Sequence, residues 1–343
     1  MPAKNSAVNF IHVPESEMRK EFARILKNYR FTDKKAELLA DIFTNNSVEG
    51  IYTHGVNRFP RFIQYIRQGA IKVDGEIILK HRGGCMEQWD GASGPGPLNA
   101  LAATDRAMEI ARKQGMGAVF LANTNHWMRG GTYGWRAARM GFGFIGWTNT
   151  MANMPAWGAK TSKLGNNPLV MALPFQEEAI VLDMAMSQYS YGALEFTALK
   201  GKSLEVFGGY DEKGELSRDP GAILKTQRTL PVGYWKGAGL SLLLDILATV
   251  FSGGLSTAAV SKLPAEQNLS QVFLVFQLGK LGNFFQIEET IKNIISDYQQ
   301  VELVDSSAQV IYPGERIVKT RAVNLQKGIP VLEKIWREIQ AMP

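Results

Sequence analysis

Cysteine is nearly absent from this chain of 343 residues, and the single Cys85 excludes an intramolecular disulfide framework. One free thiol suits a reducing compartment. The first ten residues contain no apolar core of the kind that a secretory leader carries, so we expect a cytoplasmic protein. The longest apolar stretch, 239–251, contains Asp245 and is too short to span a bilayer, which predicts a buried core helix and no membrane span.

Blocks of like charge are also absent. The 38 Lys and Arg residues are interspersed with 32 Asp and Glu residues, for a net charge of +6. Nucleic-acid binding is typically marked by a clustered basic stripe or by interleaved aromatic residues, and neither is visible, so we expect no nucleic-acid partner. The basic balance leaves one alternative from another class, a non-catalytic anion- or nucleic-acid-binding protein. Such a protein would bind duplex with a steep salt dependence and show no cofactor-dependent absorbance change.

Histidine is scarce, at four residues: His12, His54, His81 and His126. None of them forms a pair at i, i+4, and a single cysteine provides no zinc framework. We therefore expect no metal site.

The chain begins with helical periodicity. Helices are predicted over 16–29 behind a Ser16 cap, from Thr32 to near Gly50, and over 58–68 up to Gly69. Mixed patterns follow. They predict helices over 100–114, 132–140, 288–298 and 329–339 and from Gly237, strands over 118–122, 142–147, 169–173, 179–182 and 272–276, and a loop-rich stretch over 208–234.

This order of elements predicts an α/β protein. We expect a three-layer α/β/α arrangement with a mixed sheet, preceded by an N-terminal helical segment over 14–70. The sequence contains no internal repeat and no low-complexity linker. Residues 1–343 are therefore expected to form a single interleaved unit.

The segment 141–146 matches the dinucleotide fingerprint GxGxxG letter for letter. The fingerprint works only where the glycines follow a strand and begin a helix, whose N-terminus then faces the pyrophosphate. Here the glycines follow a predicted helix and lie within a predicted strand. We interpret the match as accidental and exclude a Rossmann fold.

His54 and Arg58 are four residues apart, so they would share one face of a helix. Arg58 could bind a substrate carboxylate through two parallel hydrogen bonds, and His54 could pass a proton to a carbonyl oxygen. The alternative is a capping histidine beside a surface arginine, and the local pattern alone favours it.

Three other positions suit a site. His126 follows a predicted strand and precedes Gly130 and Gly131, although a structural turn would explain the same pattern. Asp183 ends a strand, where it could accept a hydrogen bond from an imidazole or cap the next helix. Lys236 begins an apolar helix and suits a phosphate, or is simply an exposed lysine.

Four segments, 53–60, 125–131, 157–160 and 234–237, resemble the malate/L-lactate dehydrogenase family that lacks a Rossmann fold, and the resemblance covers essentially the whole chain. Trp127, Met128 and Arg129 are similar to one keto-acid reductase branch of it. The resemblance implies an L-sulfolactate dehydrogenase-like fold, reduction of a small 2-keto acid with NADH or NADPH, and a homodimer. Malate, L-lactate, ureidoglycolate and cyclic imines are alternative substrates within the wider family.

The same resemblance implies roles for individual residues. His54 would be the proton donor and Asp183 the acid that pairs with it, with Arg58 and His126 near the substrate. Cofactor contacts are implied at Ala179, Ile180, Val181, Leu182, Asp183, Met184, Ala185, Trp235, Lys236, Gly314, Glu315 and Arg316.

Overall fold

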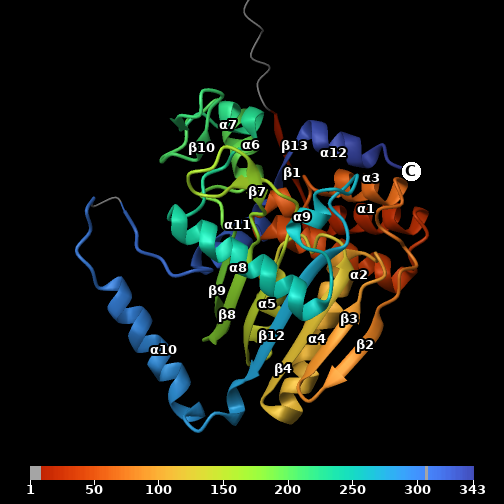
Figure 1. The fold of residues 1–343 in the computed structure, drawn as a ribbon, viewed down its shortest axis with the longest axis vertical. Coiled ribbons are helices and arrows are strands. Elements are labelled where there is room, and N and C mark those ends of the chain that lie inside the picture. The colour runs from red at the N-terminus through yellow and green to blue at the C-terminus, as the bar shows by residue number, and fades with distance from the viewer. Residues whose placement is uncertain (1–8, 306–307) are drawn as a thin grey trace, which may run out of the picture.

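The computed structural model describes residues 9–305 and 308–343. A seven-stranded sheet runs through the middle of the molecule (Figure 1). Its strands, in the order β2-β3-β4-β12-β5-β8-β9, are Ile78–Gly83, Met86–Asp90, Met116–Thr124, Leu269–Gln277, Phe142–Thr148, Leu169–Phe175 and Glu178–Met184. The pair β3 and β4 is parallel and the other neighbours are antiparallel, so the predicted mixed sheet is confirmed.

Helices cover both faces of this sheet because side chains alternate along each strand. In β4, Val119 and Leu121 pack under α4 (Gly96–Gln114) and α5 (Gly131–Arg139). The neighbouring residue Phe120 points to the opposite face, which α8 (Trp235–Ser252) covers. The expected three-layer α/β/α fold is confirmed. The GxGxxG match begins just after α5 and continues into β5, so it forms no strand-to-helix turn.

The N-terminal helices form a separate layer with its own apolar core. They are α1 (Glu15–Asn28), α2 (Asp33–Val48) and α3 (Phe59–Arg67), as predicted. The Phe22 ring stacks on the Phe59 ring with centroids 4.1 Å apart. Thr32 caps α2 by accepting from the Lys35 N–H at 3.4 Å. The predicted Ser16 cap is wrong, because α1 begins after Pro14 without a side-chain cap.

The predicted terminal helix over 329–339 is wrong in its first part. Residues Ile329–Leu332 form β13, which pairs antiparallel with β1 (Phe10–Val13), and the helix α12 spans only Glu333–Gln340. Ile329 and Val331 are both buried in the N-terminal core, two residues apart, as a strand requires. The strand therefore joins the two ends of the described chain.

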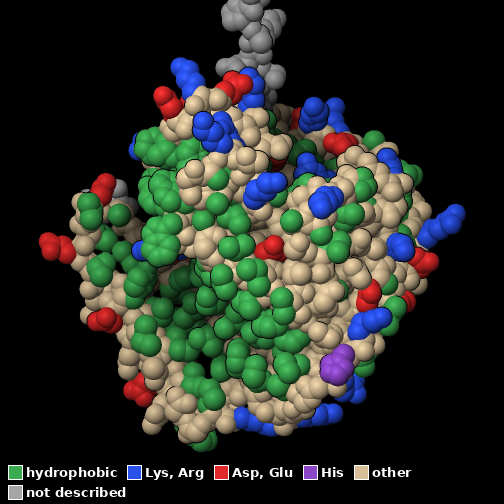
Figure 2. Space-filling model, viewed as in Figure 1, with side chains coloured by type: hydrophobic (Ala, Val, Ile, Leu, Met, Phe, Trp, Pro, Cys, Tyr) green, Lys and Arg blue, Asp and Glu red, His purple; other side chains and the backbone are tan. Residues whose placement is uncertain are grey.

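The apolar helix α8 is not a buried core helix within this chain. Ala238, Leu244 and Ala248 form its buried stripe, whereas its outer side chains remain exposed, Val250 to 66%. By length and composition α8 could cross a membrane, the sole such helix in the described ranges. The prediction was wrong because a helix on the face of a sheet buries one side only. Figure 2 shows green apolar side chains gathered over this region.

The remaining elements are short or lie at the edges of the molecule. The predicted loop-rich stretch contains two short antiparallel strands, β10 (Gly209–Tyr210) and β11 (Leu216–Ser217). It also contains a short helix, α7 (Pro220–Thr226), which Asp219 caps by accepting from the Gly221 N–H. These elements are η1 (Tyr52–His54), β6 (Met154–Pro155), β7 (Ser162–Leu164), α6 (Tyr191–Leu199), β10 (Gly209–Tyr210), β11 (Leu216–Ser217), α7 (Pro220–Thr226), α9 (Thr257–Val260), η2 (Leu278–Lys280), α10 (Phe284–Gln299) and α11 (Glu315–Lys327).

Candidate active site

The end of α2 fixes the backbone of the His54 loop. Asn46 donates from Nδ2 to the His54 carbonyl at 2.9 Å, and its Oδ1 accepts from the Thr132 hydroxyl at 2.8 Å. One residue later, the Ser47 hydroxyl oxygen accepts from the Val56 N–H at 2.8 Å. The loop that carries the histidine is therefore tied to both α2 and α5.

His54 and His126 come together although 72 positions separate them in the sequence (126 − 54). Their rings stack with centroids 5.6 Å apart and an interplanar angle of 17°. The Nδ1 of His126 accepts from the Met128 N–H at 2.9 Å, so a neutral His126 carries its proton on Nε2. This leaves an N–H donor on His126 for a ligand.

Burial and two nearby cations keep the His54 ring uncharged. Burial, Arg58 and Arg129 lower the pKa of His54 to about 3. Burial and the positive charge of Arg58 also lower the pKa of His126 well below its ordinary value. Both rings are therefore neutral near pH 7 in the free protein, and an anion bound beside them would raise both pKa values.

Arg58 lies beside the two rings and is weakly paired. Its Nη2 is 3.6 Å from the nearest carboxylate oxygen of Glu266, which is too long for a hydrogen bond. Burial lowers the pKa of Arg58, while Glu266 opposes this shift. Arg58 and His126 line the same small pocket. The guanidinium therefore keeps donors available for an anionic ligand next to the stacked rings.

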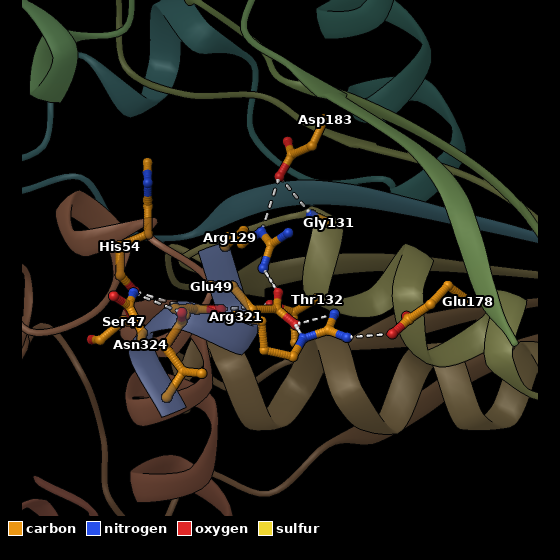
Figure 3. Close-up of polar contacts among 12 residues, drawn as sticks. Ser47, Glu49, His54, Arg129, Gly131, Thr132, Glu178, Asp183, Arg321 and Asn324 are labelled. Carbon is orange, nitrogen blue, oxygen red and sulfur yellow. Dashed lines mark hydrogen bonds and ion pairs between the residues drawn. The ribbon is translucent and has the colours of Figure 1, made fainter. Parts of the chain in front are cut away.

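Asp183, at the end of β9, lies on the other side of the site. Its Oδ2 accepts from the Gly131 N–H at 2.7 Å and is 3.9 Å from the Arg129 Nε (Figure 3). Desolvation raises the pKa of this carboxyl, against the lowering effect of Arg129. The described part of the chain contains no hydrogen bond between Asp183 and His54, so their pairing stays a prediction.

A buried ion-pair network holds Arg129 in place beside Asp183. This network was not predicted from the sequence. Glu49, at the end of α2, accepts from Arg129 with one carboxylate oxygen and from Arg321 with the other, the latter at 2.7 Å. Arg321, on α11, also pairs with Glu178 at 2.7 Å (Figure 3). Burial raises the pKa of Glu49, but Arg129 and Arg321 outweigh it and hold the pKa below its ordinary value.

Two of the segments expected to contact a cofactor lie side by side. The Val181 N–H in β9 donates to the Pro313 carbonyl at 3.0 Å. The next residue, Gly314, has φ +99°, and a Cβ there would lie 3.2 Å from the Val181 nitrogen. Glycine at this position therefore allows the start of α11, with Glu315 and Arg316, to pack directly on the strand that leads to Asp183.

The remaining expected segment, Trp235 and Lys236, lies at the start of α8. The segment before it is bonded to the residues that follow β9, because the Val232 N–H donates to the Met186 carbonyl at 2.8 Å. No side chain caps the N-terminus of α8, and Trp235 is 67% exposed. The structure thus brings Lys236 to the same end of β9 as Asp183 through hydrogen-bonded backbone.

The described residues contain no group of three or more His, Cys, Asp or Glu side chains placed to hold a metal ion. The site is built from imidazoles, guanidinium groups and carboxylates. Its chemistry is therefore that of proton transfer and anion binding by side chains.

Comparison with known proteins identifies the family of the chain. The family model described as malate/L-lactate dehydrogenase matches residues 13–340. A 2,3-diketo-L-gulonate reductase of Salmonella paratyphi A is 41% identical over 327 residues, covering 95% of this chain and 98% of that protein. The malate dehydrogenase of Entamoeba histolytica is 21% identical with a TM-score of 0.92, over 97% of both chains.

The sulfolactate dehydrogenase of Methanocaldococcus jannaschii has the same fold, with a TM-score of 0.86, 22% identity, and 96% and 95% of the two chains covered. The expected L-sulfolactate dehydrogenase-like fold is confirmed. The family match extends over nearly all described residues, including the two histidine segments and Asp183. The chain belongs to the malate/L-lactate dehydrogenase family.

Proposed function

We propose that this protein reduces 2,3-diketo-L-gulonate at its C2 carbonyl to 3-dehydro-L-gulonate, with NADH or NADPH as the reductant. The stacked pair of His54 and His126 beside the weakly paired Arg58 carries the proposal. The name and 41% identity of the Salmonella paratyphi A relative support this substrate. The reduced nicotinamide, when bound, supplies a hydride to the carbonyl carbon.

The donor set at the start of α8 and along β9 fits a nicotinamide dinucleotide. An uncapped helix N-terminus with Lys236 beside it offers N–H groups and positive charge to a pyrophosphate. Exposed aromatic rings, Trp235 and the contacting pair of Trp157 and Tyr234, offer faces for a base. The β9 segment 179–185 and Gly314 to Arg316 would complete the cofactor contacts.

Arg58 would orient the substrate through its carboxylate. A guanidinium donates two parallel hydrogen bonds to a carboxylate, which fixes the direction of the adjacent carbonyl. The bound anion would offset the positive charges that depress the pKa of His54, so substrate binding would raise this pKa. His54 would then take up a proton and donate it to the carbonyl oxygen, while His126 donates a hydrogen bond from Nε2.

Asp183 and Arg129, on the side of His54 opposite Arg58, would control the charge near the His54 ring. The pairing of Arg129 with both Asp183 and Glu49 limits the positive charge that His54 experiences. We propose that Asp183, whose side chain keeps 26% of its surface exposed, contacts His54 or the ligand in the loaded enzyme.

The activity is tested with a panel of 2-keto acids and both nicotinamides, following the change in nicotinamide absorbance. We expect kcat/KM to be highest for 2,3-diketo-L-gulonate. A higher value for oxaloacetate or pyruvate would instead favour a malate or L-lactate dehydrogenase, the two activities in the description of the family. No turnover of any acid, together with salt-dependent binding of duplex, would favour the non-catalytic anion-binding alternative.

We also propose a homodimer in the cytoplasm, with the chain acting as one interleaved catalytic unit. The exposed apolar side of α8 lies beside the hollow under the projecting helix α10, which has no buried residue (Figure 2). Phe285 on α10 is 95% exposed. A second copy of the chain would cover these surfaces. Sedimentation equilibrium should give twice the chain mass; a monomer at micromolar concentration would contradict this proposal.

A further inference from the structure

One face of α3 continues the pocket beyond Arg58. Arg61 and Tyr65 follow at i+3 and i+7, so they project from the same side of the helix. These two residues line the pocket together with Arg58, Asn125 and His126. At 1.5 Å per residue, the distance along the axis from Arg58 to Tyr65 is about 10 Å. The small pocket at Arg58 is therefore lined by two further polar side chains from the same helix.

Arg61, the Tyr65 hydroxyl and the Oδ1 of Asn125 keep hydrogen-bonding capacity that no side chain in the described part of the chain uses. Arg61 is exposed and Tyr65 is half-buried, and neither takes part in a side-chain hydrogen bond or ion pair within the described residues. By contrast, Arg67, on the same helix, donates to the Tyr29 hydroxyl. Asn125 is 1% exposed and donates from Nδ2 to three backbone carbonyls, yet its Oδ1 accepts no hydrogen bond.

An unpaired buried amide oxygen is costly and points to a missing donor. The positive charge of Arg61 lies close enough to lower the pKa values of Arg58 and His126, so the pocket holds two cations and few counter-charges. A ligand that fits must carry negative charge together with groups that both donate and accept hydrogen bonds. A carboxylate joined to a chain of hydroxyls meets all three requirements.

We propose that Arg61 and Tyr65 form a second subsite, which binds the hydroxylated tail of a sugar acid whose carboxylate lies at Arg58. This proposal rests on the proposed keto-acid reductase function. It adds that contacts at the second subsite make the enzyme prefer long hydroxylated acids over short ones. A three-carbon acid held at Arg58 leaves the subsite empty, because its end carbons are only about 3 Å apart. A six-carbon acid extends along α3 and gains contacts with Arg61 and Tyr65.

The test compares 2,3-diketo-L-gulonate with pyruvate in the wild type, Arg61→Met and Tyr65→Phe. For Arg61→Met, kcat/KM for the six-carbon acid should fall about 10- to 100-fold, mainly through KM, because a charge-assisted contact is lost. For Tyr65→Phe the loss should be about 2- to 10-fold. For pyruvate, kcat/KM should fall by a clearly smaller factor than for the six-carbon acid in both variants, because pyruvate makes no contact with the subsite.

Arg67→Met is the matched control, because it removes a guanidinium from the same helix without touching the pocket. It should leave the ratio of the two kcat/KM values at the wild-type level. An equal loss for both acids in Arg61→Met and Tyr65→Phe would overturn the subsite while leaving the reductase function intact. A wild-type protein that reduces neither acid would overturn the reductase function itself, and the subsite with it.

Discussion

Arg129 and Arg58 flank the same pair of histidines but are held in opposite ways. Arg129 is 5% exposed, pairs with Glu49 and lies 3.9 Å from Asp183. Arg58 has only Glu266 as a carboxylate partner in the described ranges, at 3.6 Å. One guanidinium is part of a closed network of protein charges, and the other keeps its donors free beside a pocket.

The difference separates structural charge from ligand-binding charge. Removing one partner of a buried ion pair leaves an uncompensated charge, so the Arg129 side should control the stability of the fold. A weakly paired cation in a pocket is stabilised only when an anion binds, so the Arg58 side should control affinity. The predictions below test whether stability and activity divide along this line.

The largest expected effect is on catalysis. His54→Asn should lower kcat about 100- to 10,000-fold, because general acid assistance to the carbonyl oxygen is lost. The melting temperature should change little, since the loop is tied through the His54 backbone carbonyl, which the variant keeps. Steady-state rates with 2,3-diketo-L-gulonate measure the effect. Turnover at the wild-type level would remove His54 from the mechanism.

Substitutions in the ion-pair network of Glu49, Arg129 and Arg321 should change the stability of the fold. Glu49→Gln should lower the free energy of unfolding by about 3 kcal/mol, because Arg129 and Arg321 lose their shared counter-charge in a buried position. Urea unfolding followed by circular dichroism measures the change. Glu15→Gln is the control, since the pair of Glu15 and Arg19 lies on the surface and should contribute less than about 1 kcal/mol.

If Glu49→Gln left stability unchanged and raised only KM, the proposed division between the two arginines would be wrong. A matching loss in Arg321→Met would strengthen it, because this substitution opens the same network from α11.

Arg58→Met should act mainly on affinity. Loss of a charge-assisted contact should raise KM for the acid about 10- to 100-fold, with little change in urea unfolding. Comparing an acid inhibitor with its amide analogue isolates the role of the carboxylate. The wild type should prefer the acid and the variant should not. Equal affinity of the wild type for both compounds would rule out a carboxylate contact.

The smallest effect concerns pH. The folded-state pKa of His54, about 3, is lower than the value near 6.5 expected when unfolded, so the folded state holds fewer protons between these values. The contribution of His54 to stability is therefore complete above about pH 6.5 and decreases as the pH falls towards 3. Urea unfolding between pH 7 and 5 should show a shallower loss for His54→Asn. Identical slopes for variant and wild type would contradict the depressed pKa.

Elements with strong local patterns could be predicted from the sequence. The helices α1, α2 and α3 and the sheet strands β4, β5, β8, β9 and β12 all lie where apolar periodicity placed them, within a few residues. Helix α11 was missed because Asn324 is its one fully buried residue, so it carries no apolar stripe. The strand β13 was taken for helix because its pairing with β1 depends on the opposite end of the chain.

The sequence by itself determined which chemical groups are present: an imidazole, a guanidinium four residues later, and a second imidazole after a buried strand. Only the tertiary structure decided that the two imidazoles stack and that Glu49 neutralises Arg129 and Arg321. The reason is that Glu49 lies 80 positions from Arg129 and 272 from Arg321 in the sequence. Local periodicity reports the face that a residue shares with its chain neighbours, whereas charge pairing depends on distance in the folded molecule.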